Sequence, residues 1–135
     1  MQDNFFDTNI LLYLASNDHI KAQKAEILLA SGGVISVQVL NEITSIARRK
    51  MNLSWDDTRS FLALISGLLQ IEPLTRETHQ TGLDLAEKYR LSVYDAMIVA
   101  AALLARCNVL WSEDMQDGLV VNGTLRILNP FSTSP

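Results

Sequence analysis

Short apolar runs alternate along the chain with longer segments in which apolar residues recur every three or four positions. The short runs predict buried strands, and the periodic segments predict helices with one apolar face. The expected strands or extended segments are residues 4–6, 34–35, 71–74, 108–111 and 125–128. The expected helices are residues 10–15, 20–30, 37–50, 55–69, 75–89 and 94–106. Strands separated by helices predict an α/β fold of three layers, with a central, mainly parallel sheet between helices.

Acidic residues stand at the edges of these elements. Asp7 follows the first strand directly, and Asp114 follows the strand 108–111 by three residues. Glu42 lies beside the apolar stripe of helix 37–50, and Asp95 stands at the start of the apolar helix 94–106. Sites in parallel sheets form beyond the carboxyl ends of the strands. Four carboxylates gathered there would suit a hard cation such as Mg²⁺ or Mn²⁺, which serves phosphoryl chemistry. The pattern therefore predicts a metal-dependent nuclease.

Each acid also has a structural alternative, because carboxylates are common near helix N-termini. Ser92 and Asp95 match a capping box, so Asp95 taken alone is better explained as a cap. Surface carboxylates on helices often have a cation three or four positions further on, as Asp18 has in Lys21. The four candidates have no such cation. The same is true of Asp3, Glu26, Asp57, Glu77, Glu113 and Asp117. The comparison therefore reduces the number of candidate site residues but does not identify them.

Length and composition indicate one domain. The 135 residues are 48% hydrophobic, which is enough for a substantial core. We expect a single domain over residues 1–130 and a loose tail over residues 131–135. The formal net charge of -4 argues against a basic surface that coats nucleic acid. It leaves a nuclease open, since bound divalent cations turn a carboxylate cluster locally electropositive. The basic run Arg48-Arg49-Lys50 is better explained as a solvated helix end than as a phosphate contact.

The sequence contains few residues or motifs that would indicate another kind of site. The one cysteine, Cys107, cannot form an intramolecular disulfide and fits a reducing compartment, so we expect a cytoplasmic protein. The first residues do not resemble a signal peptide, and no apolar run reaches transmembrane length. His19 and His79 lack metal-ligand spacing. Dinucleotide-binding and phosphate-binding glycine motifs and a nucleophilic triad are also missing.

Four ordered blocks carry a family resemblance. They are residues 6–11 (FDTNIL), Asn41-Glu42, residues 94–98 (YDAMI) and residues 112–118 (SEDMQDG). Together they resemble the PIN-domain family, and within it the VapC-type toxin ribonucleases of toxin-antitoxin pairs. The resemblance implies a parallel sheet between helices and an acidic Mg²⁺ or Mn²⁺ site. The site would be built by Asp7, Glu42, Asp95 and Asp114.

Further positions match small or acidic residues near the family's site. Asp117 matches a position that is often acidic, which makes it a candidate for a further metal ligand or an outer contact. Thr8 or Asn9, together with Ser112, match small polar positions and are candidates for orienting the carboxylates or metal-bound water. Their structural alternatives are helix capping and turn formation.

The resemblance also implies an activity and partners. The activity is hydrolysis of RNA phosphodiester bonds, in which the carboxylate-held ions lower the pKa of a bound water and neutralise the phosphate. It implies products with a 5′-phosphate and a 3′-hydroxyl, a homodimer, and a cognate antitoxin that blocks the site. Two alternatives remain. One is a catalytically weak binding module that acts through an antitoxin or a dimer partner, and the other is a small-molecule phosphohydrolase.

Overall fold

The computed structural model describes residues 3–132, and a six-stranded sheet runs through their centre. The strand order is β3-β2-β1-β4-β6-β5. All neighbours pair in parallel except β5, which is antiparallel to β6. The mainly parallel α/β architecture expected from the sequence is therefore confirmed. The strands are β1 (Asn4–Phe6), β2 (Val34–Ser36), β3 (Gln70–Glu72), β4 (Val109–Trp111), β5 (Val120–Val121) and β6 (Leu125–Leu128).

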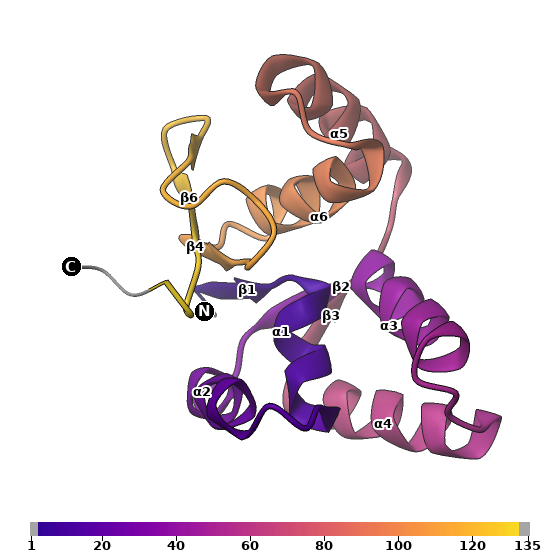
Figure 1. Cartoon of the computed structure of the whole chain (residues 1–135). Helices are drawn as coiled ribbons and strands as arrows, with labels where there is room; N and C mark the ends of the chain where they lie inside the picture. The colour runs from indigo at the N-terminus through magenta and orange to yellow at the C-terminus, as the bar shows by residue number, and fades with distance from the viewer. Residues whose placement is uncertain (1–2, 133–135) are drawn as a thin grey trace.

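Helices flank the sheet on both sides (Figure 1). In this view α5 and α6 lie on one side, whereas α1, α2 and α4 lie on the other. Helix α3 contacts both α1 and α6 and so connects the two helical layers beside β2. The helices are α1 (Thr8–Leu12), followed by the 3-10 turn η1 (Tyr13–Ala15), then α2 (His19–Leu29), α3 (Val37–Arg49), α4 (Trp55–Leu68), α5 (Arg76–Tyr89) and α6 (Val93–Leu104).

Side-chain caps explain where most of these helices begin. Each capping hydroxyl accepts a hydrogen bond from the backbone amide three residues later, which satisfies a donor left free by the helix start. This arrangement occurs at α3, α4, α5 and α6. The capping residues are Ser36, Ser54, Thr75 and Ser92. The expected cap at Ser92 is thus present, and its partner is the amide of Asp95.

The core includes buried residues of the sheet, of α6, and of helices α1 to α4. Phe5, Phe6, Ile35, Leu110 and Ile127 are fully buried on the strands. Helix α6 is buried over most of its circumference, as its nearly uniform apolar sequence predicts. At Gly33 the chain passes so close to β1 that an added Cβ would lie 2.3 Å from the Phe6 ring. Close packing of this kind fixes the end of β1, and therefore the position of the residue that follows it.

The order of the sheet creates a switch point between β1 and β4. From β1 the chain proceeds to β2 and β3 on one side, then returns to place β4 on the other side of β1. The register pairs Phe6 with Trp111, so the two strands end side by side. Ligand sites in open parallel sheets form at such a point, beyond the carboxyl ends of the strands. A functional site is therefore expected in the segments after Phe6 and after Trp111.

Some elements differ from the sequence-based expectation. The expected helix 10–15 begins two residues earlier, at Thr8, and ends in the 3-10 turn η1. The third extended segment is shifted to Gln70–Glu72. Strand β5 was not expected at all, and it forms through a tight turn in which Asn122 and Gly123 have φ of 49° and 74°.

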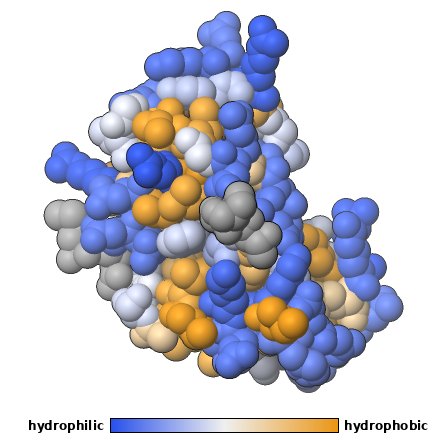
Figure 2. Space-filling view, turned by 60° about the vertical axis from the view of Figure 1, so that its left-hand side comes forward, coloured by the Kyte–Doolittle hydropathy of each residue, from blue (hydrophilic) through white to orange (hydrophobic). Residues whose placement is uncertain are grey.

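The end of the described chain contacts the core. The Phe131 ring lies edge to face with Tyr13, at a centroid distance of 5.1 Å. Residues 133–135 of the expected tail lie outside the described residues, and the division at residue 130 stays a prediction. No helix within residues 3–132 combines the length and the apolar character needed to cross a membrane. Figure 2 shows one face of the molecule, where hydrophobic side chains lie in small patches between hydrophilic ones.

Candidate active site

Asp7 is held at the point where β1 and β4 end. Its backbone amide continues the sheet by donating to the Trp111 carbonyl at 2.9 Å. Its Oδ1 accepts a hydrogen bond from the Thr8 amide, and its Oδ2 accepts one from the Ser112 hydroxyl, both at 2.7 Å. The residue is only 5% exposed. One carboxylate oxygen is thus tied to the start of α1 and the other to the turn after β4.

Burial makes the Asp7 charge costly. It raises the pKa of Asp7 from 3.8 to about 6, even though hydrogen bonds from Ser112 and Thr8 favour the charged form. The negative charges of Asp95 and Glu42 raise that pKa further. Within residues 3–132 the one ion pair is Lys21 with Glu113, so no described cation compensates Asp7. A positive charge brought to this place would therefore stabilise the ionised carboxylate.

Glu42 reaches the same place from α3. Its Oε1 accepts from the Thr8 hydroxyl at 2.7 Å, and its Oε2 accepts from the Gln38 side-chain amide at 3.0 Å. Thr8 therefore holds two carboxylates, Asp7 through its backbone amide and Glu42 through its hydroxyl. Glu42 is partly buried on α3. Gln38 was not predicted, although its position one helical turn before Glu42 could have indicated it.

Asp95 and Asp114 complete the acidic group. Asp95 lies half-buried in the first turn of α6, where burial raises its pKa and the Ser92 hydrogen bond lowers it. The charges of Glu42 and Asp114 raise the Asp95 pKa further. Asp114 lies exposed in the turn after β4 and accepts a hydrogen bond from the Asn9 side-chain amide of α1. Asp95 is thus both part of a capped helix start and a member of the acidic group.

The structure brings four of the five predicted acidic residues into electrostatic contact. Asp7 interacts with Asp95 and Glu42, and Asp95 interacts with Glu42 and Asp114. Asp117 differs, because its Oδ1 accepts from the Asn129 amide at 2.9 Å on the exposed loop before β5. A role for Asp117 as a metal ligand stays a prediction. The polar residues Thr8, Asn9 and Ser112 all donate to carboxylates of the group, as expected.

The donor set suits a hard divalent cation in its chemistry. It consists of carboxylate oxygens, without thiolate or imidazole, which favours Mg²⁺ or Mn²⁺ over zinc or copper. Between residues 3 and 132, no three His, Cys, Asp or Glu side chains stand close enough together to hold a metal ion as they are. Mg²⁺ usually takes one or two carboxylates and keeps several waters, so a loose acidic group is compatible with it. The uncompensated burial of Asp7 is the observation that fits a bound cation.

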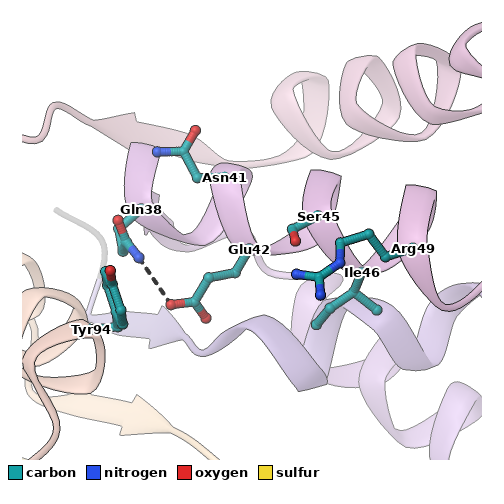
Figure 3. A pocket seen from close by; sticks show the side chains of 7 residues that line it. All are labelled: Gln38, Asn41, Glu42, Ser45, Ile46, Arg49 and Tyr94. Carbon is teal, nitrogen blue, oxygen red and sulfur yellow. Dashed lines mark hydrogen bonds between the residues drawn. The ribbon is translucent and has the colours of Figure 1, made fainter.

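A pocket of about 500 Å³ opens beside Glu42 (Figure 3). Its floor is one face of α3, and Tyr94 at the start of α6 bounds it on the other side. Because Glu42 belongs to both the pocket and the acidic group, the two are continuous. This pocket was not predicted from the sequence. Its lining residues are Gln38, Asn41, Glu42, Ser45, Ile46, Arg49 and Tyr94.

A second polar contact braces the turn that carries Asp114. The Lys21 ammonium pairs with Glu113 and donates to the Tyr13 hydroxyl at 3.1 Å. The same ammonium lies 5.1 Å from the centre of the Phe131 ring. Spacing alone suggested Asp18 as the partner of Lys21, but Asp18 instead accepts from the Lys21 backbone amide as the cap of α2. The residue next to Asp114 is therefore tied to α2 and η1.

Comparisons with known proteins agree with this geometry. The family model of the PIN domain matches residues 5–116. A toxin-antitoxin complex from Klebsiella pneumoniae has a similar structure, with a TM-score of 0.74 and 22% identity over 96% of this chain and 99% of that chain. VapC20 of Mycobacterium tuberculosis, described as a sarcin-ricin loop cleaving toxin, has a TM-score of 0.65 and 20% identity over 82% of this chain and 91% of its own.

A third solved structure is similar over almost the whole chain. It is VapBC2 from Rickettsia felis bound to a DNA fragment from its promoter, with a TM-score of 0.66 and 18% identity over 93% of this chain and 98% of that chain. A search of curated proteins finds no match. The family match covers most of the chain and includes Asp7, Glu42, Asp95 and Asp114. The chain therefore belongs to the PIN domain family.

Proposed function

We propose that this chain is a cytoplasmic, Mg²⁺- or Mn²⁺-dependent endoribonuclease and the toxin of a toxin-antitoxin pair. One observation carries the proposal: four carboxylates interact electrostatically near the switch point of the sheet, and no described cation compensates the buried one among them. A bound divalent cation would compensate these charges and could act on a phosphate ester. Asp7, Glu42, Asp95 and Asp114 would hold the cation, with Asp117 as a further ligand or outer contact.

The chain's own residues would set the geometry of the reaction. A bound Mg²⁺ or Mn²⁺ would supply a polarised water and neutralise charge on the phosphate. Thr8 keeps Asp7 and Glu42 in fixed relative positions, and Ser112 fixes the second oxygen of Asp7. Asn9 joins Asp114 to α1, so the start of α1 holds three of the four carboxylates. Burial of Asp7 limits access of bulk water to that carboxylate.

Similar structures support the assignment to a toxin. One is a toxin-antitoxin complex, another a toxin that cleaves the sarcin-ricin loop, and the third a VapBC2 complex bound to promoter DNA. By this likeness we propose a cognate antitoxin that covers the acidic group, RNA as the substrate, and a homodimer. Expression from the native gene neighbourhood would test the partner, because an antitoxin should co-purify in stoichiometric amount.

The activity is tested by incubating purified protein with total cellular RNA in Mg²⁺, in Mn²⁺ and in excess chelator. Asp7→Asn, prepared identically, should be inactive. Asp84→Asn removes an exposed carboxylate of α5 and should cleave like the wild type. Cleavage that persists in chelator, or that Asp7→Asn retains, would contradict the proposal. Absence of cleavage, together with stoichiometric capture of a partner, would favour the weakly catalytic binding module.

A further inference from the structure

We propose that the pocket along α3 binds a nucleotide of single-stranded RNA next to the cleaved bond, with Tyr94 stacking on its base and Arg49 binding its outer phosphate. The inference rests on the proposed nuclease function, because it places the nucleotide relative to the acidic group. It adds two residues that act in substrate binding and belong to neither the carboxylates nor their hydrogen-bond partners.

The pocket has the shape and position that such a nucleotide requires. Gln38, Glu42, Ser45 and Arg49 recur at three- and four-residue intervals and line one face of α3. The volume of about 500 Å³ lies within the range typical of small-ligand sites. Glu42 stands at the end shared with the acidic group, where the reacting phosphate would lie. An RNA strand that leaves the acidic group along α3 therefore enters this pocket first.

Tyr94 is exposed where a core role would bury it. It is 67% exposed, and it directly precedes Asp95 at the start of α6. Its ring faces the pocket beside the Gln38 and Glu42 side chains (Figure 3). An accessible aromatic ring beside a groove that can follow a nucleic-acid backbone is a common platform for an unpaired base. Stacking would fix the base while the adjacent phosphate reaches the carboxylates.

Arg48 and Arg49 are neighbours with different contacts. Arg48 donates to the Leu53 carbonyl at 2.7 Å and lies 4.2 Å from the centre of the Trp55 ring, so it ties α3 to α4. Arg49 is exposed, lines the pocket, and forms no ion pair within residues 3–132. Figure 3 shows its guanidinium over Ile46, on the same side of α3 as Glu42. It is thus placed to bind an anion.

Helix geometry separates Arg49 from the reacting phosphate. Glu42 and Arg49 are seven positions apart on one α-helix, which corresponds to about 10 Å along the axis. One phosphate cannot contact both ends of that interval directly. Arg49 would therefore bind a neighbouring phosphate and help an acidic protein with net charge -4 retain RNA. The basic run was expected to be a solvated helix end. In this proposal Arg48 has a structural role and Arg49 binds a phosphate.

The test uses short single-stranded RNA that contains 2-aminopurine, whose fluorescence is quenched by stacking. Binding is titrated in Mg²⁺, in an Asp7→Asn background that prevents cleavage. Tyr94→Leu should lower the affinity about tenfold and abolish the protein-induced quenching, whereas Tyr94→Phe should retain both. Arg49→Gln should reduce the slope of log affinity against log salt by about 0.7, the loss of one phosphate contact. Arg76→Gln, an exposed arginine away from the pocket, should leave the slope unchanged.

The outcomes separate this inference from the proposed function. If the chain with Asp7 intact cleaves RNA but Tyr94→Leu and Arg49→Gln bind RNA like their background, the pocket assignment fails and the nuclease stands. If the quenching and the salt slope change as stated while no RNA is cleaved, the binding site stands and the nuclease fails. If Tyr94→Leu and Arg49→Gln bind RNA unchanged but no longer bind a co-expressed protein partner, the pocket binds that protein and the inference is overturned.

Discussion

The Ser112 hydroxyl donates a 2.7 Å hydrogen bond to Oδ2 of Asp7, across 105 positions of sequence. Both residues are buried, and each follows one of the two strands that meet at the switch point of the sheet. The same hydroxyl accepts from the Met115 amide at 3.1 Å, so it also closes the turn that carries Asp114. A single side chain thus couples the charge of one carboxylate to the position of another.

Ser112→Ala should raise the pKa of Asp7 above about 6, because the hydrogen bond from Ser112 favours the charged form. The substitution should also lower the free energy of unfolding at pH 7 by about 1–3 kcal/mol, since a buried charged acceptor loses its donor. The pKa is measured from the Asp7 carboxyl carbon by NMR in metal-free protein. Ser60→Ala, at an exposed position of α4, should change neither quantity. An unchanged Asp7 pKa would show that the hydrogen bond does not hold the charge.

The raised pKa of Asp7 predicts how the stability of the metal-free protein depends on pH. Between pH 3.8 and about 6 the folded state binds the proton more tightly than the unfolded state does. The contribution of Asp7 to stability is therefore greatest below pH 3.8, falls as the pH rises through that interval, and stays low above it. The fall is on the order of 3 kcal/mol, because each pKa unit corresponds to about 1.4 kcal/mol.

Asp7→Asn should remove this part of the pH dependence. The amide has nearly the same shape and can still accept from the Thr8 amide, but it cannot ionise. The variant should thus be more stable than the wild type at pH 7 in the absence of metal, and the difference should shrink toward pH 4. Urea unfolding at a series of pH values measures it. Parallel curves for the two proteins over that range would contradict a raised Asp7 pKa.

Substitutions at Thr8 can separate the orientation of Glu42 from the folding of the chain. Thr8→Val keeps the backbone amide that binds Asp7 and nearly the same volume, but it removes the hydroxyl that donates to Glu42. Removal of a residue that orients a metal-binding carboxylate typically costs 10–100-fold in activity or metal affinity. We expect a loss of about tenfold in RNA cleavage. Thr8→Ser restores the hydroxyl and should recover most of it, whereas equal loss in both variants would point to packing at this buried position.

The fold was largely predictable because its signals are local. Apolar runs, helical periodicity and capping hydroxyls such as Ser54 and Ser92 act within a few residues, and the structure uses them where the sequence places them. Strand β5 was missed although Asn122-Gly123 is a strong hairpin signal, because only two residues of the strand precede the turn. Its stability comes from pairing with β6, a partner that the local pattern does not define.

The site was predictable only in part, because some of its contacts depend on tertiary packing and not on local sequence. Asp7 and Asp114 follow strands, so topology alone indicates that they approach each other. The contact of Lys21 with Glu113 spans 92 positions, and the spacing of Lys21 to Asp18 suggested a different pair. The separate roles of Arg48 and Arg49 depend on where α4 places Trp55. Contacts set by tertiary packing are those that residue spacing could not supply.

Replacing Asp95 tests whether its carboxylate stabilises the start of α6 or binds a metal ion. Burial and the charges of Glu42 and Asp114 raise its pKa, so Asp95→Asn should increase the thermal unfolding temperature of the chelated protein. The Ser92 cap survives, because its partner is the backbone amide of residue 95. Mg²⁺ should stabilise the wild type by mass action and the variant much less. Scanning calorimetry of both proteins, with Asp84→Asn as the control, measures this. Equal destabilisation of Asp95→Asn with and without Mg²⁺ would show that the carboxylate serves the helix and not the cation.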